Sequence, residues 1–209
     1  MTRVGLDLDN TIVGYDHLFV EVAAERGWLD GPVGDKRRVR DAVRRRHDGE
    51  TLWQEVQAEV YAYRMDRAVP MAGVGDFLDR CRERGVPVFV VSHKTVHAAR
   101  DPGRVDLRRQ AMAWMEARGW FAGAAPVLDP ARVFFEATRE AKVDRIAGLD
   151  LTHFVDDLEE VFRVGHFPRP VARILFAPGE DGRPGDWRVA RSWDEVSRAV
   201  FGPGSEETR

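Results

Sequence analysis

Short apolar runs alternate with amphipathic segments along most of this chain. The apolar runs are rich in Val and Phe and apolar on both faces, which is typical of strands buried in a parallel sheet. We predict strands at residues 3–8, 86–91, 132–135, 152–155 and 173–176. We predict helices at residues 16–26, 36–47, 52–65, 74–84, 106–118, 139–148, 158–164 and 193–200. This alternation predicts an α/β fold with a doubly wound parallel sheet.

The segment between the first two predicted strands is far longer than a single crossover helix requires. We expect residues 13–68 to form a small all-helical insertion and residues 1–12 and 69–201 to form a Rossmann-like core. Within the insertion, Thr51 followed by Gln54 has the pattern of a capping box that opens a helix. The insertion follows the carboxyl end of the first strand, where it could cover a site as a lid. The alternative is a peripheral helical bundle with no catalytic part.

Composition and charge exclude several classes of protein. The formal net charge is −3 and the pI is about 6.1, so electrostatics do not favour nucleic acid or an anionic membrane as a partner. Cys81 is the single cysteine, which excludes a disulfide within the chain. The sequence has no apolar run of membrane-spanning length, and Asp7 comes too early for a signal peptide. We expect a cytoplasmic protein with a polar, disordered tail at residues 202–209.

Lysine is unusually rare among the basic residues. Of 32 basic residues only Lys36, Lys94 and Lys142 are lysines, and the rest are arginines. A lysine that is kept against such a bias is a candidate for a position where a compact ammonium group matters.

The most informative stretch is VGLDLDNT at residues 4–11. Asp7 and Asp9 follow an apolar run, at the carboxyl end of the first strand, where open α/β sheets bind ligands. Crowded carboxylates repel each other unless a proton or a cation lies between them. The pattern therefore indicates a Mg²⁺ site. For this segment taken alone, a solvated turn or a helix N-cap would explain the acids equally well.

Further polar clusters follow later strands in a consistent order. Ser92 follows the second predicted strand, Asp156 and Asp157 follow the fourth, and Lys142 lies near the start of a helix between them. All would meet at one edge of a parallel sheet. Carboxylates from two strands can hold Mg²⁺, while a hydroxyl and an ammonium group can hold the oxygens of a phosphate.

The order DLDNT, VVSHK, a lone lysine and FVDD resembles the four motifs of the haloacid dehalogenase-like (HAD) hydrolase superfamily. The resemblance covers residues 3–176, and the insertion lies where that superfamily has a helical cap, here of the small C1 type. An acid at Asp9 resembles the phosphatase branch of the superfamily.

The resemblance implies a role for each matching residue. Asp7 would be the nucleophile and a metal ligand, and Asp9 the general acid/base whose main-chain carbonyl also binds the metal. Ser92 and Lys142 would bind phosphate, Asp156 and Asp157 would bind Mg²⁺, and Thr11 would steady the loop. His93 is a further candidate for lining the phosphate. We also expect substrate contacts from Lys94, Tyr15, His17 and Arg64, with a solvated loop or cap core as the alternative.

The expected function is that of a Mg²⁺-dependent phosphatase that hydrolyses a small phosphorylated metabolite through an aspartyl-phosphate. A phosphomutase, another phosphotransferase or a nucleotidase would use the same residues. A signalling receiver domain is disfavoured by the chain order, and a binding protein without turnover by the complete set of acids. The basic run at residues 36–46 is interpreted as a solvated helix face or as an attraction for an anionic substrate.

Overall fold

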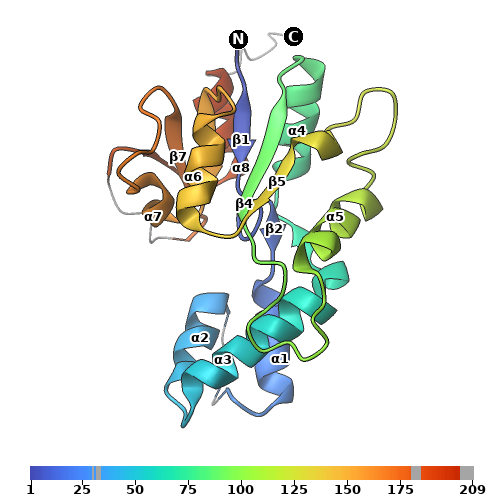
Figure 1. Ribbon diagram of the computed structural model, residues 1–209, viewed down its shortest axis with the longest axis vertical. Coiled ribbons are helices and arrows are strands. Elements are labelled where there is room, and N and C mark those ends of the chain that lie inside the picture. Colours follow the sequence, from blue (N-terminus) through green and yellow to red (C-terminus); the bar gives the residue numbers. More distant parts are fainter. Residues whose placement is uncertain (30, 32–33, 180–184, 203–209) are drawn as a thin grey trace. The chain divides into compact units, whose positions relative to one another are not determined.

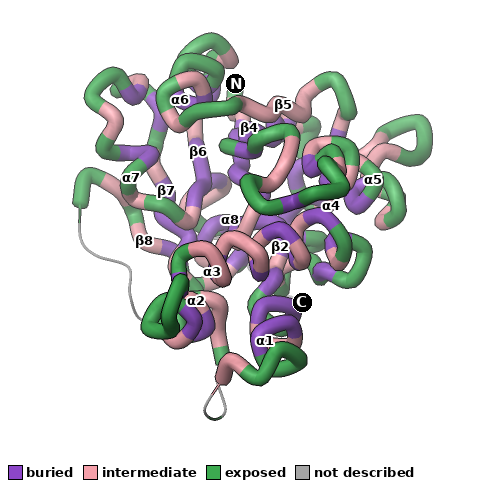
Figure 2. The backbone as a smooth tube through the Cα atoms, turned by 60° about the horizontal axis from the view of Figure 1, so that its bottom comes forward, coloured by how far each residue is buried: buried purple, intermediate pink, exposed green. Residues whose placement is uncertain are grey.

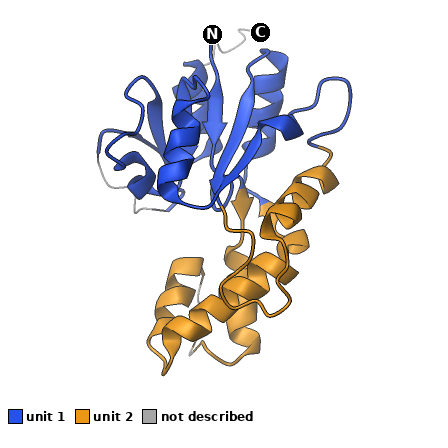
Figure 3. Cartoon of the chain, viewed as in Figure 1, with its two compact units in different colours: residues 1–12, 70–93, 120–209 blue, residues 13–69, 94–119 orange. Residues whose placement is uncertain are grey.

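The computed structural model describes residues 1–209 except residues 30, 32–33, 180–184 and 203–209. The predicted disordered tail therefore lies outside the described residues apart from Gly202. The chain divides into two compact units (Figure 3). Unit 1 contains residues 1–12, 70–93 and 120–209, and unit 2 contains residues 13–69 and 94–119. Residues 94–119, which we had placed in the core, thus group with the helical insertion.

Unit 1 is built on a six-stranded sheet in which each strand pairs with its neighbour in parallel (Figure 1). The strand order is β5-β4-β1-β6-β7-β8. The strands are β1 (Val4–Leu6), β4 (Val88–His93), β5 (Val133–Glu136), β6 (His153–Asp156), β7 (Ala172–Phe176) and β8 (Arg188–Ala190). The helices are α4 (Val74–Glu83), η3 (Pro130–Arg132), α6 (Arg139–Ala147), α7 (Glu159–Phe162) and α8 (Trp193–Phe201). The predicted α/β parallel sheet is confirmed.

The order of the strands creates a switch point at β1. The chain runs outward from β1 through β4 to β5, then returns to β6 on the other side of β1. The connection after β1 therefore leads toward β4 on one side of the sheet, and the connection after β6 leads toward β7 on the other side. In open α/β sheets, ligands bind outside the carboxyl ends of the strands at such a point.

Helices cover both faces of the sheet. On one face, Val143 and Ile146 of α6 pack in one cluster with Phe89, Val91 and Phe154 of the sheet. On the other face, α4 and α8 meet: the ring centroids of Phe77 and Trp193 lie 5.0 Å apart, and Trp193 lies 5.4 Å from Phe176 of β7. The strands between these layers are largely buried (Figure 2). This packing holds the strand ends in fixed positions.

Unit 2 is mainly helical. Its elements are β2 (Val13–Gly14), α1 (Asp16–Glu25), α2 (Lys36–Arg44), α3 (Gly49–Ala58), the π-helical η1 (Glu59–Tyr63), η2 (Met65–Arg67) and α5 (Leu107–Ala117). The short strand β3 (Val69–Pro70) pairs with β2 at the junction with unit 1. Phe19 stacks on Trp53 with ring centroids 5.1 Å apart. None of the described helices is long and apolar enough to cross a membrane.

Two hydrogen bonds join α5 to the insertion. The indole Nε1 of Trp114 donates to the carbonyl of Ala68 at 2.9 Å, and Arg118 Nη2 donates to the same carbonyl at 2.5 Å. Both donors come from α5 or its end, whereas the acceptor closes the insertion. The amphipathic pattern of α5 predicts which side of the helix is buried, but it does not predict the segment that covers this side.

Two local predictions are wrong. The capping box at Thr51 does not start a helix, because α3 already begins at Gly49 after Asp48, whose φ is 57°. Gly49 permits this early start, since a Cβ there would lie 2.4 Å from the carbonyl oxygen of Arg44. Strand β8 was missed because its three residues are too few to give a periodic signal.

Gly5 offers a test of the packing around β1. It pairs with Phe89 on one side and Phe154 on the other, and a Cβ at this position would lie 2.5 Å from both Leu151 Cδ1 and Phe154 Cδ2. We expect Gly5→Ala to lower the free energy of unfolding by about 1–3 kcal/mol, because the added methyl group enters a core that is already filled. Chemical denaturation measures the change.

The matched control is Gly75→Ala in α4, where a Cβ meets no atom within 4 Å. That substitution should stabilise the protein by up to about 1 kcal/mol, through helix propensity alone. Equal effects of the two substitutions would contradict the packing described for Gly5.

Candidate active site

The register of the sheet brings two acids to the same level. Leu6 pairs with Val90 of β4 and with Val155 of β6. The amide of Asp7 then donates to the carbonyl of Val155 at 2.8 Å, which extends the ladder by one residue. Asp7 and Asp156 therefore leave adjacent strands at the carboxyl edge. Because side chains alternate along a strand, both acids share the face that α6 covers.

Helix α6 delivers the lysine to this face. The hydroxyl of Thr138 accepts a hydrogen bond from the amide of Ala141 at 3.1 Å and caps the helix. Lys142 Nζ donates to Asp7 Oδ1 at 2.5 Å and to Asp156 Oδ2 at 2.7 Å. Asp7 is 5% exposed, Lys142 1% and Asp156 0%. One ammonium group thus lies buried between two carboxylates from different strands.

Amide groups donate to the second oxygen of Asp156 and to Asp157. The amide of Leu158 donates to Asp156 Oδ1 at 3.0 Å, and Asn10 Nδ2 donates to Asp157 Oδ2 at 3.3 Å. Asn10 has a φ of 61°, a left-handed conformation that asparagine tolerates well. We had not assigned a role to Asn10. Its place directly after Asp9, in a turn, was the available signal.

The acids outnumber the ammonium group. Asp7, Asp156 and Asp157 each offer an oxygen atom, and these atoms lie within 4.8 Å of one another. Burial, together with the charges of Asp156 and Asp9, raises the pKa of Asp7 to about 7 although Lys142 opposes the shift. Burial alone would lower the pKa of Lys142, but Asp156 and Asp7 outweigh it and raise that pKa above its ordinary value. An oxygen-rich cluster with excess negative charge fits a hard divalent cation such as Mg²⁺.

Two hydroxyl groups near these acids in the chain are buried and have no hydrogen-bond partner in the part of the chain that the structure describes. Ser92 lies at the carboxyl end of β4, and Thr11 follows the turn after Asp9. Neither Ser92 Oγ nor Thr11 Oγ1 has a hydrogen-bond partner among the described residues. A buried unsatisfied hydroxyl costs about 1–3 kcal/mol, which a bound ligand oxygen would offset. That Thr11 steadies the loop stays a prediction.

The structure also shows the surroundings of the other predicted site residues that follow β1 and β4. Asp9 is half-buried in the turn after β1. His93 is exposed, and its Nε2 lies 3.1 Å from the carbonyl oxygen of Ala137. Lys94 is buried and belongs to unit 2, where its Nζ lies 5.0 Å from the ring centroid of Tyr61.

The residues of the insertion that we expected to contact the substrate have partners within unit 2. Tyr15 is fully buried and its hydroxyl donates to Met65 Sδ at 3.2 Å, while His17 Nε2 lies 3.2 Å from the carbonyl oxygen of Arg67. Arg64 forms ion pairs with three acids. These acids are Glu21, Glu25 and Glu59, at 2.6, 2.6 and 3.1 Å. Contact between these residues and a substrate stays a prediction.

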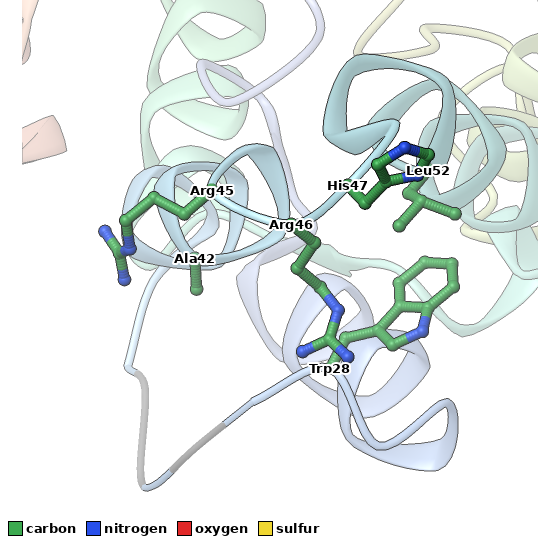
Figure 4. A pocket seen from close by; sticks show the side chains of 6 residues that line it. All are labelled: Trp28, Ala42, Arg45, Arg46, His47 and Leu52. Atoms are coloured by element: carbon green, nitrogen blue, oxygen red, sulfur yellow. The ribbon is translucent and has the colours of Figure 1, made fainter.

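Unit 2 also contains a pocket of about 520 Å³ (Figure 4). It is lined by Trp28, Ala42, Arg45, Arg46, His47 and Leu52. None of these is a predicted site residue. Arg45, Arg46 and His47 are exposed, as a solvated end of the basic run would be.

Comparison with known proteins identifies the fold. No model of a known protein family matches the chain, and no curated protein matches its sequence. Three solved structures illustrate the likeness. A HAD-superfamily hydrolase from Ehrlichia chaffeensis is 12% identical with a TM-score of 0.56, and the match covers 96% of this chain and 97% of that one.

A HAD-superfamily hydrolase of subfamily IA, variant 1, from Geobacter sulfurreducens is 11% identical with a TM-score of 0.56, and the match covers 96% of both chains. A protein from Clostridium acetobutylicum, described as a predicted phosphatase, is 16% identical with a TM-score of 0.60, over 95% of this chain and 97% of that one. The chain therefore has the Rossmann-like fold of HAD-superfamily hydrolases. The resemblance inferred from the four motifs is confirmed at the level of the fold.

The raised pKa of Asp7 predicts that the metal-free protein becomes less stable as the pH rises. The folded state keeps a proton on Asp7 up to about pH 7, whereas the unfolded chain releases it near the ordinary value of 3.8. The free energy of unfolding should therefore fall as the pH rises from about 4 to 7. Asp7→Asn removes this dependence, so in EDTA the variant should be more stable than the wild type above pH 7.

Urea denaturation at pH 5, 6, 7 and 8 measures this difference. Asp144→Asn is the control, because Asp144 lies on the same helix as Lys142 but its side chain is 73% exposed. A difference between Asp7→Asn and the wild type that is constant over this pH range would contradict the assignment.

Magnesium should stabilise the folded protein through the acid cluster. At a concentration of a hundred times its Kd, a ligand that binds only the folded state adds about 2.7 kcal/mol to the free energy of unfolding. We expect thermal denaturation to show a rise in Tm with Mg²⁺ that is largely lost in Asp157→Asn and kept in Asp144→Asn. An equal rise in both variants would place the ion elsewhere.

Proposed function

We propose that the protein is a Mg²⁺-dependent phosphatase that hydrolyses a small phosphorylated metabolite through an aspartyl-phosphate. The observation that carries the proposal is the contact of Lys142 Nζ with Asp7 and Asp156, at 2.5 and 2.7 Å. This contact gathers a nucleophile, a cation and a metal-binding acid from three separate elements. The HAD fold supports the same class of reaction. Membership of the HAD phosphatases, with unit 2 as the cap, is part of the proposal.

Asp7 is the nucleophile in this scheme. One of its carboxylate oxygens attacks the phosphorus in line, the bond from phosphorus to the leaving oxygen breaks, and an aspartyl-phosphate forms. Lys142 holds the carboxylate in a fixed orientation and offsets charge on the phosphoryl oxygens. The hydroxyl of Ser92, which has no hydrogen-bond partner among the described residues, is available to donate to one of those oxygens.

Asp9 transfers the protons. It begins protonated and gives its proton to the leaving oxygen, so that the alcohol departs neutral. The resulting carboxylate then takes a proton from a water molecule whose oxygen attacks the phosphorus. This second displacement releases inorganic phosphate and restores the Asp7 carboxylate.

Mg²⁺ fits the oxygen cluster described above. Asp7, Asp156 and Asp157 would hold it, and the bound ion would supply positive charge to the phosphoryl group. The contacts of Lys142 with Asp7 and Asp156 support these roles.

Turnover should depend on both N-terminal acids. We expect Asp7→Asn to lower kcat by about a thousandfold or more, because the nucleophile is lost. Asp9→Asn should lower kcat by about 10²–10⁴-fold, the usual contribution of general acid–base catalysis. Release of inorganic phosphate from a panel of phosphomonoesters, with and without Mg²⁺, measures these changes.

Asp144→Asn serves as the control and should keep wild-type turnover. Phosphate release without an added sugar bisphosphate would separate a phosphatase from a phosphomutase. Retention of activity by Asp7→Asn would eliminate the proposed mechanism.

A further inference from the structure

We propose that Asn10 is a positioning residue, which orients the carboxylate of Asp157 toward the divalent cation and so favours Mg²⁺ over the larger Ca²⁺. The inference rests on the proposed function, because that function assigns the cation to Asp7, Asp156 and Asp157. It adds a residue that would act on the cation through one of these acids, without contacting the cation itself.

Asn10 lies in a tight turn directly after the first strand. The amide of Ile12 donates to the carbonyl of Leu8 at 2.9 Å, which closes the turn around Asp9 and Asn10. The φ of Asn10 is 61°, in the left-handed region. Glycine adopts such a backbone at the lowest steric cost, and asparagine does so more readily than most other residues. The turn alone would therefore accept a residue with no side chain at this position.

The side chain of Asn10 reaches the segment after the neighbouring strand. Its Nδ2 donates to Asp157 Oδ2 at 3.3 Å, although the two residues are 147 positions apart in the chain. Both residues are half-buried and belong to unit 1, in which β1 and β6 pair in register. An amide is a neutral donor, so it can orient a carboxylate without cancelling the charge that attracts a cation.

The acids of the cluster are thus held by two kinds of donor. Lys142 donates to Asp7 and Asp156, at 2.5 and 2.7 Å, while Asn10 donates to Asp157. The oxygen atoms that the three acids offer lie within 4.8 Å of one another. Partners that orient the ligands of a metal matter for its affinity, and their loss typically costs about 10–100-fold. The hydrogen bond from Asn10 is a partner of this kind.

The orientation of a carboxylate matters more to Mg²⁺ than to Ca²⁺. Mg²⁺ requires nearly ideal octahedral geometry with oxygen atoms at about 2.0–2.1 Å, whereas Ca²⁺ accepts oxygen atoms at about 2.3–2.6 Å in flexible arrangements. A carboxylate that can rotate therefore remains an adequate ligand for Ca²⁺ but often leaves the orientation that suits Mg²⁺. By restricting the carboxylate of Asp157, Asn10 contributes to the preference for the smaller ion.

Asn10→Gly tests the inference, because it removes the amide donor while glycine keeps a φ of 61° without strain. Calorimetric titrations of the whole protein with magnesium chloride, and separately with calcium chloride, measure the two Kd values. We expect the Kd for Mg²⁺ to rise about tenfold or more and the Kd for Ca²⁺ to rise less than about threefold. A loss of local structure would instead weaken the binding of both ions alike.

Asp150→Gly is the matched control. It introduces a glycine at another residue of unit 1 with a positive φ, 49°, where the side chain is exposed. Both Kd values should stay within about twofold of the wild type, because an exposed charge is screened by salt. The inference is wrong if the wild type binds no Mg²⁺, if Asn10→Gly weakens both ions equally, or if it acts no more strongly than Asp150→Gly.

Phosphate release separates this inference from the proposed catalysis. At a Mg²⁺ concentration equal to the wild-type Kd, a tenfold rise in Kd should lower the rate of Asn10→Gly about fivefold by mass action, and saturating Mg²⁺ should restore most of it. If no phosphomonoester is hydrolysed but the ion affinities change as expected, the proposed function fails and the role of Asn10 stands. If hydrolysis requires Mg²⁺ equally in the wild type and in Asn10→Gly, the role of Asn10 fails and the proposed function stands.

Discussion

The buried contact of Lys142 with Asp7 and Asp156 is the constraint on which the rest of the site depends. Burying three charged groups carries a desolvation cost that only close, hydrogen-bonded geometry can offset. That geometry requires β1 and β6 to be neighbours in register, and α6 to be packed against the same face of the sheet. Gly5 serves this requirement indirectly, because its missing side chain lets Phe154 pack beside β1. The fold is therefore arranged so that one ammonium group reaches two strands.

The site is also a place where the structure is less stable than it could be. The pKa of Asp7 is raised, the acids outnumber the ammonium group, and two buried hydroxyls lack partners among the described residues. Each feature is unfavourable for an isolated protein and favourable for one that binds a cation and an oxyanion. Natural proteins depart from local consistency in this way at functional sites. The unfavourable features thus point to the ligand as directly as the favourable contacts do.

The sequence predicted those parts that depend on local pattern. Apolar runs located β1, β4 and β6, whose carboxyl ends carry Asp7, Ser92 and Asp156. The sequence did not predict what depends on packing between distant segments, such as the grouping of α5 with unit 2 through Ala68. It also missed β8, which is too short to have a period, and the hydrogen bond from Asn10 to Asp157. A turn residue reveals its conformational preference in the sequence, but not its partner.

The three lysines show how composition and geometry inform each other. A guanidinium group brings five donors in a rigid fork, whereas an ammonium group is a compact charge with three rotatable donors. Lys142 donates to one oxygen of each of two carboxylates in a fully buried space, and the larger arginine fork would have to find further acceptors there. At Tyr61, Lys36 Nζ donates to the tyrosine hydroxyl and lies near the rings of Phe19 and Tyr61. At Lys142, a residue type that is rare in this sequence therefore lies where a small cation must fit a confined set of partners.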